Sequence, residues 1–397
     1  MKLNKTFLTL GLAATLLQMP TSSFAQNAGG NRQNPLLVKS SLPFGAPDFS
    51  KIQESDYLPA FEAGIKEQRA NIQKIISNKK KPTFQNTILA YENSGMLLDR
   101  VSNVFFGLTS AHKTPGIAEA QKKVMPLLTD LDNEISFNQK LFERIKYVYD
   151  HEYNKLKGED KRLTEVIYKG FVRSGALLSP EKMERMKQIN TRISDLQEQF
   201  GNLLPAATNN AVVWVNSKEE LAGLSDADIA QCKKDAESLG NKAPYCIVIV
   251  NTTQQAILTN LQNRELRRKV YMASIHRADG TDPKFNTFPI VTEIAKLRAE
   301  KGQLMGYNTY ADYSLEKTMA KNAKNVNNFL QSLIKEYAPK ADAETREIEA
   351  YAQKSEGKDF KLQPYDRFYY SAKMKKEMLN ISDDEIKPYF NVDSVQI

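Results

Sequence analysis

Apolar residues recur every three or four positions through most of the chain, which is the spacing of one face of an α-helix. Because this spacing runs through most of the chain, the predicted fold class is mainly α. The first two predicted helices lie close in sequence and are expected to form a helical hairpin. The helices are predicted over residues 55–77, 84–111, 116–152, 160–175, 253–275, 285–305, 309–319, 326–354, 364–379 and 382–390.

A further long helix is predicted to begin at Ser179-Pro180-Glu181. Serine is a favoured N-cap residue, proline fits the first helical position, and an acid in the first turn complements the helix dipole. Apolar residues from Met186 to Leu203 then alternate at steps of three and four. This spacing is typical of a helix that packs lengthwise on a neighbour, and we expect the helix to end at Pro205.

The pattern changes over residues 211–250, where two β-branched and aromatic runs are flanked by turn residues. Residues 211–215 and 245–250 are predicted to form a small strand pair. Between them, Ser225 is expected to cap a short helix, and Gly240 is expected to close it.

The N-terminus is typical of a secretory signal. Lys2 and Lys5 precede an apolar run over residues 7–17, and small residues lead to an expected cleavage site after Ala25. No later segment reaches the ~20 apolar residues of a membrane-spanning helix, and no cysteine follows the apolar run to carry a lipid. We predict an exported, periplasmic protein with a signal peptide over residues 1–25.

Residues 26–50 are rich in Gly, Asn, Ser and Pro without a helical period. They are predicted to form a flexible leader followed by an extended arm. Residues 51–250 are then expected to form an N-terminal helical domain that includes the strand pair.

Composition fits an ordinary globular protein, with 41% hydrophobic and 26% charged residues among 397. The net charge of +8 includes Lys2 and Lys5 and is spread along the chain, so neither a nucleic-acid nor a membrane partner is indicated. Lys79-Lys80-Lys81 is interpreted as a solvated loop. Cys232 and Cys246 can either pair or remain free as small buried hydrophobes.

A zinc hydrolase of the His-Glu-x-x-His type needs two histidines four residues apart on one helical face, with a glutamate as base. No such segment occurs. The nearest sequence begins at His151-Glu152, but Lys155 stands where the second histidine would be, and a cation repels a divalent metal. His112 and His276 are placed at helix ends. A three-histidine site is not expected, because it would need all three histidines of the chain to converge.

Other catalytic patterns are also missing from the sequence. No Gly-x-Ser-x-Gly elbow and no phosphate-binding loop occurs, and Gly170 and Gly175 have the wrong spacing for such a loop. The acidic runs Glu219-Glu220 and Asp383-Asp384-Glu385 are interpreted as solvated helix starts.

Two segments leave alternatives open. The polar run Asn251-Thr252-Thr253-Gln254-Gln255 could offer hydrogen bonds to a peptide along the strand edge, or Thr252 or Thr253 could cap the next helix. The arginines that follow could bind a substrate carboxylate or form structural ion pairs; they are Arg264, Arg267 and Arg268.

Several motifs, in order, resemble the thimet oligopeptidase and neurolysin family of zinc metallopeptidases, and its peptidyl-dipeptidase members in particular. The resemblance covers nearly the whole chain after residue 26. The motifs are Asn34-Pro35-Leu36-Leu37, Leu42-Pro43-Phe44-Gly45, Tyr57-Leu58-Pro59-Ala60-Phe61-Glu62, Pro82-Thr83-Phe84-Gln85-Asn86-Thr87-Ile88, Gly170-Phe171-Val172-Arg173-Ser174-Gly175-Ala176, Asn251-Thr252-Thr253-Gln254-Gln255, Asn263-Arg264-Glu265-Leu266-Arg267, Leu304-Met305-Gly306-Tyr307 and Lys387-Pro388-Tyr389-Phe390.

The resemblance implies a helical, two-lobed fold with a channel for oligopeptides, from which dipeptides are released at the free C-terminus. It also implies one zinc ion, held by a His-Glu-x-x-His helix and a later glutamate. These elements lie beyond Tyr389-Phe390 in the family, so the resemblance places no catalytic, cofactor-binding or metal-binding residue on this chain. Residues 251–397 are therefore expected to be the truncated start of the catalytic domain.

Two functions follow from the sequence. The first is the N-terminal part of a periplasmic peptidase, with a C-terminal half that could be separately encoded. The second is a non-catalytic scaffold that binds a peptide or a partner. Because both lobes of such a fold share long helices, we expect a chain without the second half to expose the apolar stripes over residues 186–203 and 326–341.

Overall fold

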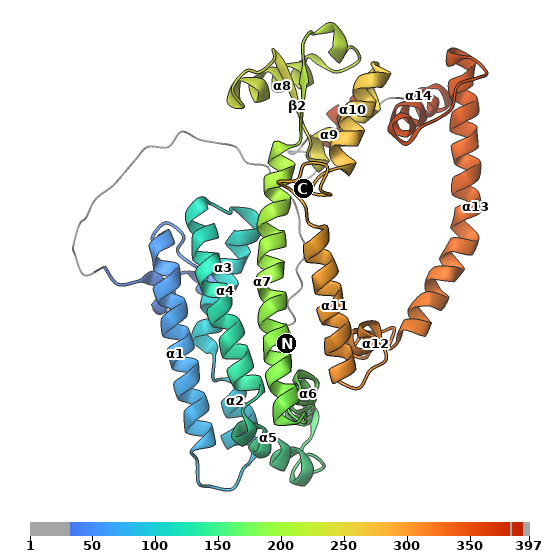
Figure 1. Cartoon of the computed structure of the whole chain (residues 1–397). Helices are drawn as coiled ribbons and strands as arrows, with labels where there is room; N and C mark the ends of the chain where they lie inside the picture. Colours follow the sequence, from blue (N-terminus) through green and yellow to red (C-terminus); the bar gives the residue numbers. More distant parts are fainter. Residues whose placement is uncertain (1–31, 382, 392–397) are drawn as a thin grey trace. The chain divides into compact units, whose positions relative to one another are not determined.

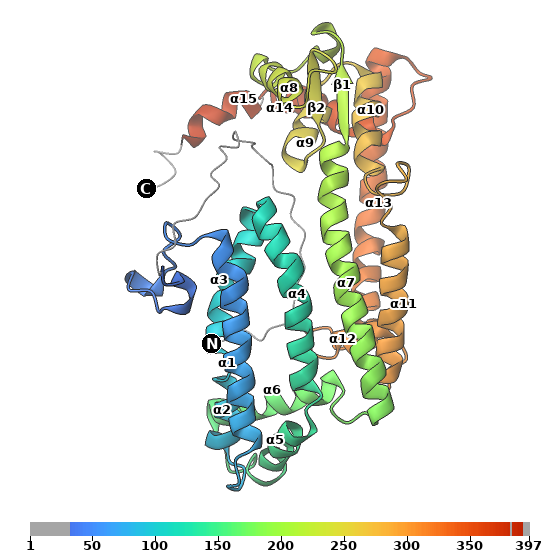
Figure 2. The same cartoon turned by 60° about the vertical axis from the view of Figure 1, so that its left-hand side comes forward.

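The computed structural model describes residues 32–381 and 383–391, with only the backbone described at 251–253, 383, 384 and 387. The predicted signal peptide and the beginning of the leader lie outside these residues. The fold is mainly α, as predicted, and the described residues contain one two-stranded antiparallel sheet (Figures 1 and 2). None of the described helices is long and apolar enough to cross a membrane.

The chain divides into two compact units that are not continuous in sequence. The first takes residues 32–199 and Ile290–Ser314, and the second takes Phe200–Pro289 and the described residues from Leu315 onward. The predicted domain boundary at residue 250 stays a prediction.

The first unit is an assembly of helices preceded by short turns of the arm (Figure 1). Three 3-10 turns, η1 (Pro35–Leu37), η2 (Pro43–Gly45) and η3 (Glu54–Asp56), interrupt the predicted extended arm and lead into the first helix. The helical elements are α1 (Tyr57–Ile76), the π-helical turn η4 (Phe84–Leu89), α2 (Ala90–Glu92), α3 (Met96–Ala111), α4 (Pro115–Ser136), α5 (Gln139–His151), α6 (Gly158–Ser174), the first part of α7 (Pro180–Asn210), most of α11 (Phe288–Leu304) and most of α12 (Tyr310–Leu315).

The hydrophobic core of this unit forms where α1 packs on α3, as the predicted hairpin requires. Phe61 and Phe105 are fully buried, and their rings meet edge to face with centroids 5.2 Å apart. Gly64 allows the two helices to approach closely, because a Cβ there would lie 3.0 Å from the Leu98 Cα.

The single helix predicted over residues 84–111 is wrong, because the chain turns between α2 and α3. Gly95 lies at this turn against α1, where an added Cβ would come within 2.9 Å of the Gln68 side chain. Periodicity alone did not reveal the break, since apolar residues continue at helical spacing on both sides of it.

Helix α7 begins at Pro180 as predicted, and the Lys182 amide donates to the Ser179 hydroxyl at 3.4 Å. The predicted end at Pro205 is wrong, because α7 continues to Asn210. An interior proline costs about 3 kcal/mol or more. Packing of apolar residues on both sides of Pro205 offsets this cost. Leu196 is 1% exposed, and Ala207 packs in a small buried cluster with Phe285.

The expected exposure of the 186–203 stripe is also wrong. Met186 and Ile189 are fully buried. Figures 1 and 2 both show α7 and α11 side by side, and two bidentate pairs join them: Arg185 to Glu300 and Arg192 to Glu293, at 2.6–2.8 Å. Neighbouring helices within this part of the chain therefore cover the stripe.

The second unit contains the predicted strand pair. Strand β1 (Val212–Val215) pairs antiparallel with β2 (Tyr245–Val248), with Val213 opposite Ile247 (Figure 2). Helix α8 (Asp226–Ser238) packs on β2. As predicted, the Asp228 amide donates to the capping Ser225 hydroxyl at 3.1 Å, and Gly240 follows the helix with φ at +92°.

The rest of the second unit is helical. Helix α13 packs its C-terminal half on α14 through Ile348 and Ala352, which are buried with Tyr369 and Tyr370. The remaining elements are η5 (Glu219–Leu221), α9 (Asn251–Asn260), α10 (Arg264–Ile275), α13 (Ala323–Glu356), η6 (Pro364–Asp366), α14 (Arg367–Leu379), α15 (Asp383–Ile386) and η7 (Lys387–Phe390).

The N-terminal half of α13 presents an exposed apolar stripe, as predicted for residues 326–341. Phe329 is 62% exposed and Tyr337 is 67% exposed, and Leu330, Leu333 and Ile334 lie between them on the same helix. Single exposed apolar residues are ordinary, whereas a contiguous row of this kind is typical of an interaction surface.

Candidate functional site

The three histidines all lie at helix ends, as predicted for His112 and His276. His112 is the C-cap of α3, and His151 is the last residue of α5, where it stacks on Tyr147. His276 is the C-cap of α10, and its Nδ1 lies 2.6 Å from Asp279 Oδ2. This contact lowers the pKa of Asp279 to about 2.

No group of three or more His, Cys, Asp or Glu side chains in the described part of the chain could hold a metal ion. In the segment that resembles a zinc motif, Glu152 Oε2 accepts a hydrogen bond from the Phe84 amide at 3.1 Å. That carboxylate therefore has a structural role at the start of η4. The expectation that this chain carries no catalytic, cofactor-binding or metal-binding residue stays a prediction.

The polar run at residues 251–255 forms the first turns of α9, directly after β2. The predicted cap at Thr252 or Thr253 is wrong, because the extended residue Val250 precedes the helix and Asn251 is its first residue. Gln254 accepts a hydrogen bond from the Ser274 hydroxyl at 2.8 Å and so joins α9 to α10. Peptide binding along this strand edge stays a prediction.

A buried ion pair centred on Asp366 joins α10 to η6 and the start of α14. Arg267 is 1% exposed and Asp366 is fully buried, and Arg267 Nη2 donates to Asp366 Oδ1 at 2.9 Å. The other guanidinium nitrogen, Nη1, donates to the Leu261 and Gln262 carbonyls at 2.8 and 3.0 Å. The Tyr369 ring lies 4.1 Å from the guanidinium carbon.

Arg264 completes this cluster from the solvent side. Its Nη2 donates to Asp366 Oδ2 at 2.8 Å and to the Lys361 carbonyl at 2.9 Å. The hydrogen bonds to Asp366 raise the pKa of Arg264. Arg268 pairs instead with Glu265, at 2.7 Å. The interpretation of these arginines as structural ion pairs is therefore confirmed.

The acidic runs and the lysine loop also lie where they were predicted. Glu219 and Glu220 begin the short turn η5, and Lys79-Lys80-Lys81 is an exposed loop after α1. Asp383 begins α15, although its side chain and that of Asp384 lie outside the described atoms.

Sequence analysis missed a largely buried lysine, Lys301, on α11. Its Nζ donates to Asn190 Oδ1 on α7 at 2.7 Å, and Asn190 Nδ2 donates to Asn133 Oδ1 on α4 at 3.0 Å. Burial lowers the pKa of Lys301. No local signal identifies this residue, because its hydrogen-bond partner Asn190 lies on a helix more than a hundred residues earlier in the chain.

Cys232 and Cys246 are free thiols and both are buried, on α8 and β2. Burial raises the pKa of Cys232 to about 12 and that of Cys246 to about 11. A cavity of about 100 Å³ beside Cys232 is lined by residues of α8, β2 and α9. The interpretation of these cysteines as small buried hydrophobes therefore fits the structure.

The chain is similar in sequence to two bacterial peptidases. Dipeptidyl carboxypeptidase from Escherichia coli is 35% identical over 363 residues, which are 91% of this chain and 53% of that protein. Oligopeptidase A from the same organism is 30% identical over 361 residues, covering 90% of this chain and 52% of the relative. The chain spans about half the length of these curated relatives.

The profile of peptidase family M3 matches residues 257–397. This range begins inside α9 and includes the arginines that bind Asp366. The relationship inferred from the ordered motifs is confirmed by the profile and by the named relatives together. The chain belongs to peptidase family M3.

Proposed function

We propose that this chain is the N-terminal part of a zinc-dependent peptidase that releases dipeptides from the free C-termini of oligopeptides. The metal site would lie in a C-terminal half, either continuous with this chain or encoded separately. The observation that carries the proposal is the 35% identity with a dipeptidyl carboxypeptidase of which this chain spans 53%. In this proposal the chain supplies the framework that positions the peptide.

Two structural features support the proposal that this chain supplies the framework and a C-terminal half supplies the metal site. The described residues contain no group of side chains suited to zinc. The N-terminal half of α13 also exposes a row of apolar side chains, including Phe329 and Tyr337, which a further half of the peptidase would shield from water.

The experiment is metal analysis combined with a dipeptide-release assay. The purified chain alone is expected to bind no stoichiometric zinc and to release no dipeptide from an N-blocked tetrapeptide, because its described residues provide no set of zinc ligands. Co-expression with the C-terminal half, taken from the native reading frame or from the Escherichia coli relative, is expected to give zinc binding and chelator-sensitive release.

Stoichiometric zinc with chelator-sensitive release by the chain alone would contradict the proposal. The search for ligands would then return to His112, His151 and His276. A catalytically silent C-terminal half, with its His-Glu-x-x-His glutamate replaced by glutamine, is the matched control because it retains the metal ligands.

We propose further that the protein is exported to the periplasm. The support is the N-terminal sequence, with Lys2 and Lys5 before an apolar run and a small-residue cleavage pattern ending at Ala25. Expression of the full chain is expected to give a periplasmic product whose N-terminus is Gln26, as read by mass spectrometry. A product that remains in the cytoplasm with its first residues intact would refute this part.

The second candidate is a non-catalytic scaffold that binds a peptide or a protein partner. The exposed stripe on α13 favours it independently of any chemistry. The same co-expression experiment separates the candidates: a complex that forms but never gains zinc or releases dipeptides supports the scaffold.

A further inference from the structure

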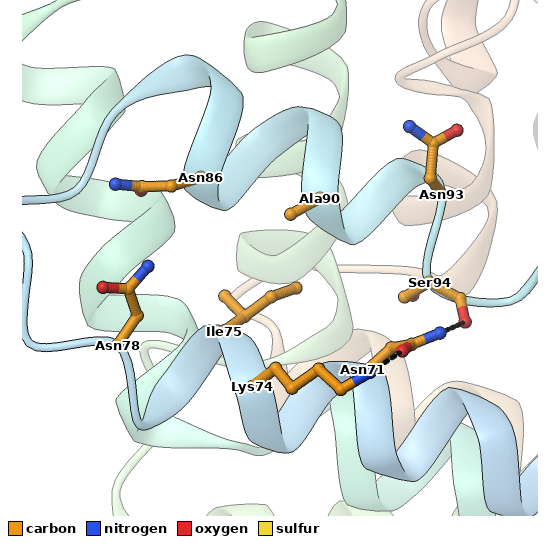
Figure 3. Close-up of a pocket in the computed structure, with 8 residues that line it drawn as sticks. All are labelled: Asn71, Lys74, Ile75, Asn78, Asn86, Ala90, Asn93 and Ser94. Carbon is orange, nitrogen blue, oxygen red and sulfur yellow. Dashed lines mark hydrogen bonds between the residues drawn. The ribbon is translucent and has the colours of Figure 1, made fainter.

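The first unit contains an open cavity of about 370 Å³, lined mostly by polar residues, that no part of the proposed peptidase function uses. It lies between the C-terminal end of α1 and the segment formed by η4, α2 and the following turn (Figure 3). A π-helical turn such as η4 is rare and is frequent at functional sites. The lining residues are Asn71, Lys74, Ile75, Asn78, Asn86, Ala90, Asn93 and Ser94.

Some of the lining side chains are fixed by hydrogen bonds to the protein. Asn86 Nδ2 donates to the Lys81 carbonyl at 2.9 Å, and Asn86 Oδ1 accepts from the Thr83 amide at 2.9 Å. Asn71 Nδ2 donates to the Ser94 carbonyl at 3.0 Å (Figure 3). These bonds hold both walls of the cavity in place before any ligand enters.

Other polar groups in the lining are still available. Ser94 is 1% exposed, and its hydroxyl has no hydrogen-bond partner. In the described part of the chain, the Asn93 side chain and Asn78 Nδ2 also have no protein partner, since Asn78 uses only its Oδ1, toward the Lys80 amide. A buried hydroxyl without a partner costs free energy, which a ligand with a matching group would recover.

The charge of the cavity is positive. Lys74 Nζ donates to Asn71 Oδ1 at 3.2 Å, and none of the lining residues is acidic. Behind the wall, Arg144 Nη1 donates to the Asn78 carbonyl at 2.8 Å and Arg144 Nη2 donates to Asn86 Oδ1 at 3.2 Å. One cation in the lining and one behind it favour an anionic ligand.

We propose that this cavity binds a small organic carboxylate that carries amide or hydroxyl groups beside the carboxylate. The Lys74 ammonium pairs with the carboxylate. The neighbouring amide or hydroxyl groups of the ligand form hydrogen bonds with the side chains of Asn78, Asn93 and Ser94. Asparagine amides and serine hydroxyls can both donate and accept such bonds. Ile75 and Ala90 line the cavity from opposite sides (Figure 3), and the carbon skeleton of the ligand would pack between them. The volume of the cavity lies in the range of small-molecule binding sites.

The test is a ligand-observed NMR titration of the full chain with four probes. N-acetylglycine carries a carboxylate and an amide, gluconate carries a carboxylate and hydroxyls, acetate has the carboxylate alone, and N-acetylglycinamide lacks it. At least one of the first two is expected to bind saturably and about tenfold more tightly than the last two. Whichever of these two probes binds more tightly shows whether the cavity prefers an amide or hydroxyl groups beside the carboxylate.

Variants assign the binding to this cavity. Lys74→Gln is expected to weaken the best probe about tenfold, because a charge-assisted hydrogen bond is lost. Lys79→Gln is the matched control, since Lys79 is exposed in the adjacent loop and does not line the cavity. Asn93→Ala is expected to weaken the amide or hydroxyl probe while leaving acetate unchanged.

Absence of saturable binding by all four probes would overturn the proposal. Equal affinity in the Lys74→Gln and Lys79→Gln variants would overturn it as well, because the binding would then lie elsewhere. Circular dichroism of each variant distinguishes a lost contact from a lost fold. The readout needs no zinc and no peptidase activity, so its result is independent of the proposed function.

Discussion

Replacing Asp366 with alanine is expected to lower the free energy of unfolding of the second unit by about 3–5 kcal/mol, the cost of stranding one partner of a buried ion pair. Arg267 would keep its charge in a position that is 1% exposed, with its Nη2 left without an acceptor. Arg264 would lose its carboxylate as well. The measurement is chemical denaturation of the full chain, followed by circular dichroism.

Arg268→Ala is the matched control on the same helix. Arg268 pairs with Glu265 at the surface, so its removal is expected to change stability little. A double replacement, Arg267→Met with Asp366→Leu, is expected to recover much of the loss because it leaves no buried charge unpaired. If Asp366→Ala were no more destabilising than Arg268→Ala, the cluster would not stabilise the contact between α10 and η6.

Alkylation of Cys232 at pH 8 is expected to be slower in the folded chain than in the unfolded chain by about a thousandfold, because the nucleophile is the thiolate. Burial raises the pKa of this thiol from 9.0 to about 12. The pKa of Cys246 is raised to about 11, so its reaction is expected to slow by about a hundredfold. Iodoacetamide labelling, followed by mass spectrometry with and without denaturant, measures both rates.

These thiols also contribute a pH dependence of stability. Their folded pKa values lie above the unfolded value, so the unfolded chain releases protons first as the pH rises above 9. The free energy of unfolding is therefore expected to fall from about pH 9 upward. The Cys232→Ala and Cys246→Ala variants should each show less of this decline. Rapid labelling of either cysteine in the folded chain would show that the thiol is not buried.

Features that depend on neighbours in sequence were predicted well. Ser179 and Ser225 cap α7 and α8, because a hydroxyl bonds an amide three residues further along the chain. The strand pair was recognised from its β-branched runs, and its partners are Val213 and Ile247. Helix α13 was recognised from a stripe of apolar residues over residues 326–341.

Features that depend on distant partners were not predicted. Pro205 was expected to end α7, yet packing of Ala207 in a buried cluster with Phe285 keeps the helix intact. The 186–203 stripe was expected to be exposed, yet α11 lies beside α7 and is joined to it by ion pairs such as Arg185 with Glu300. The helix predicted over residues 84–111 is broken at the turn before α3, where Gly95 lies against the Gln68 side chain of α1.

The sequence by itself determined the mainly α fold class and the membership of peptidase family M3, because helical period, caps and ordered motifs are local properties of the chain. Only the tertiary structure decided what the polar side chains do. Arg267 meets a carboxylate 99 residues away at Asp366, and Lys301 meets an amide 111 residues away at Asn190. Burial and hydrogen-bond partners are set by which helices pack together, and a linear pattern does not contain that information.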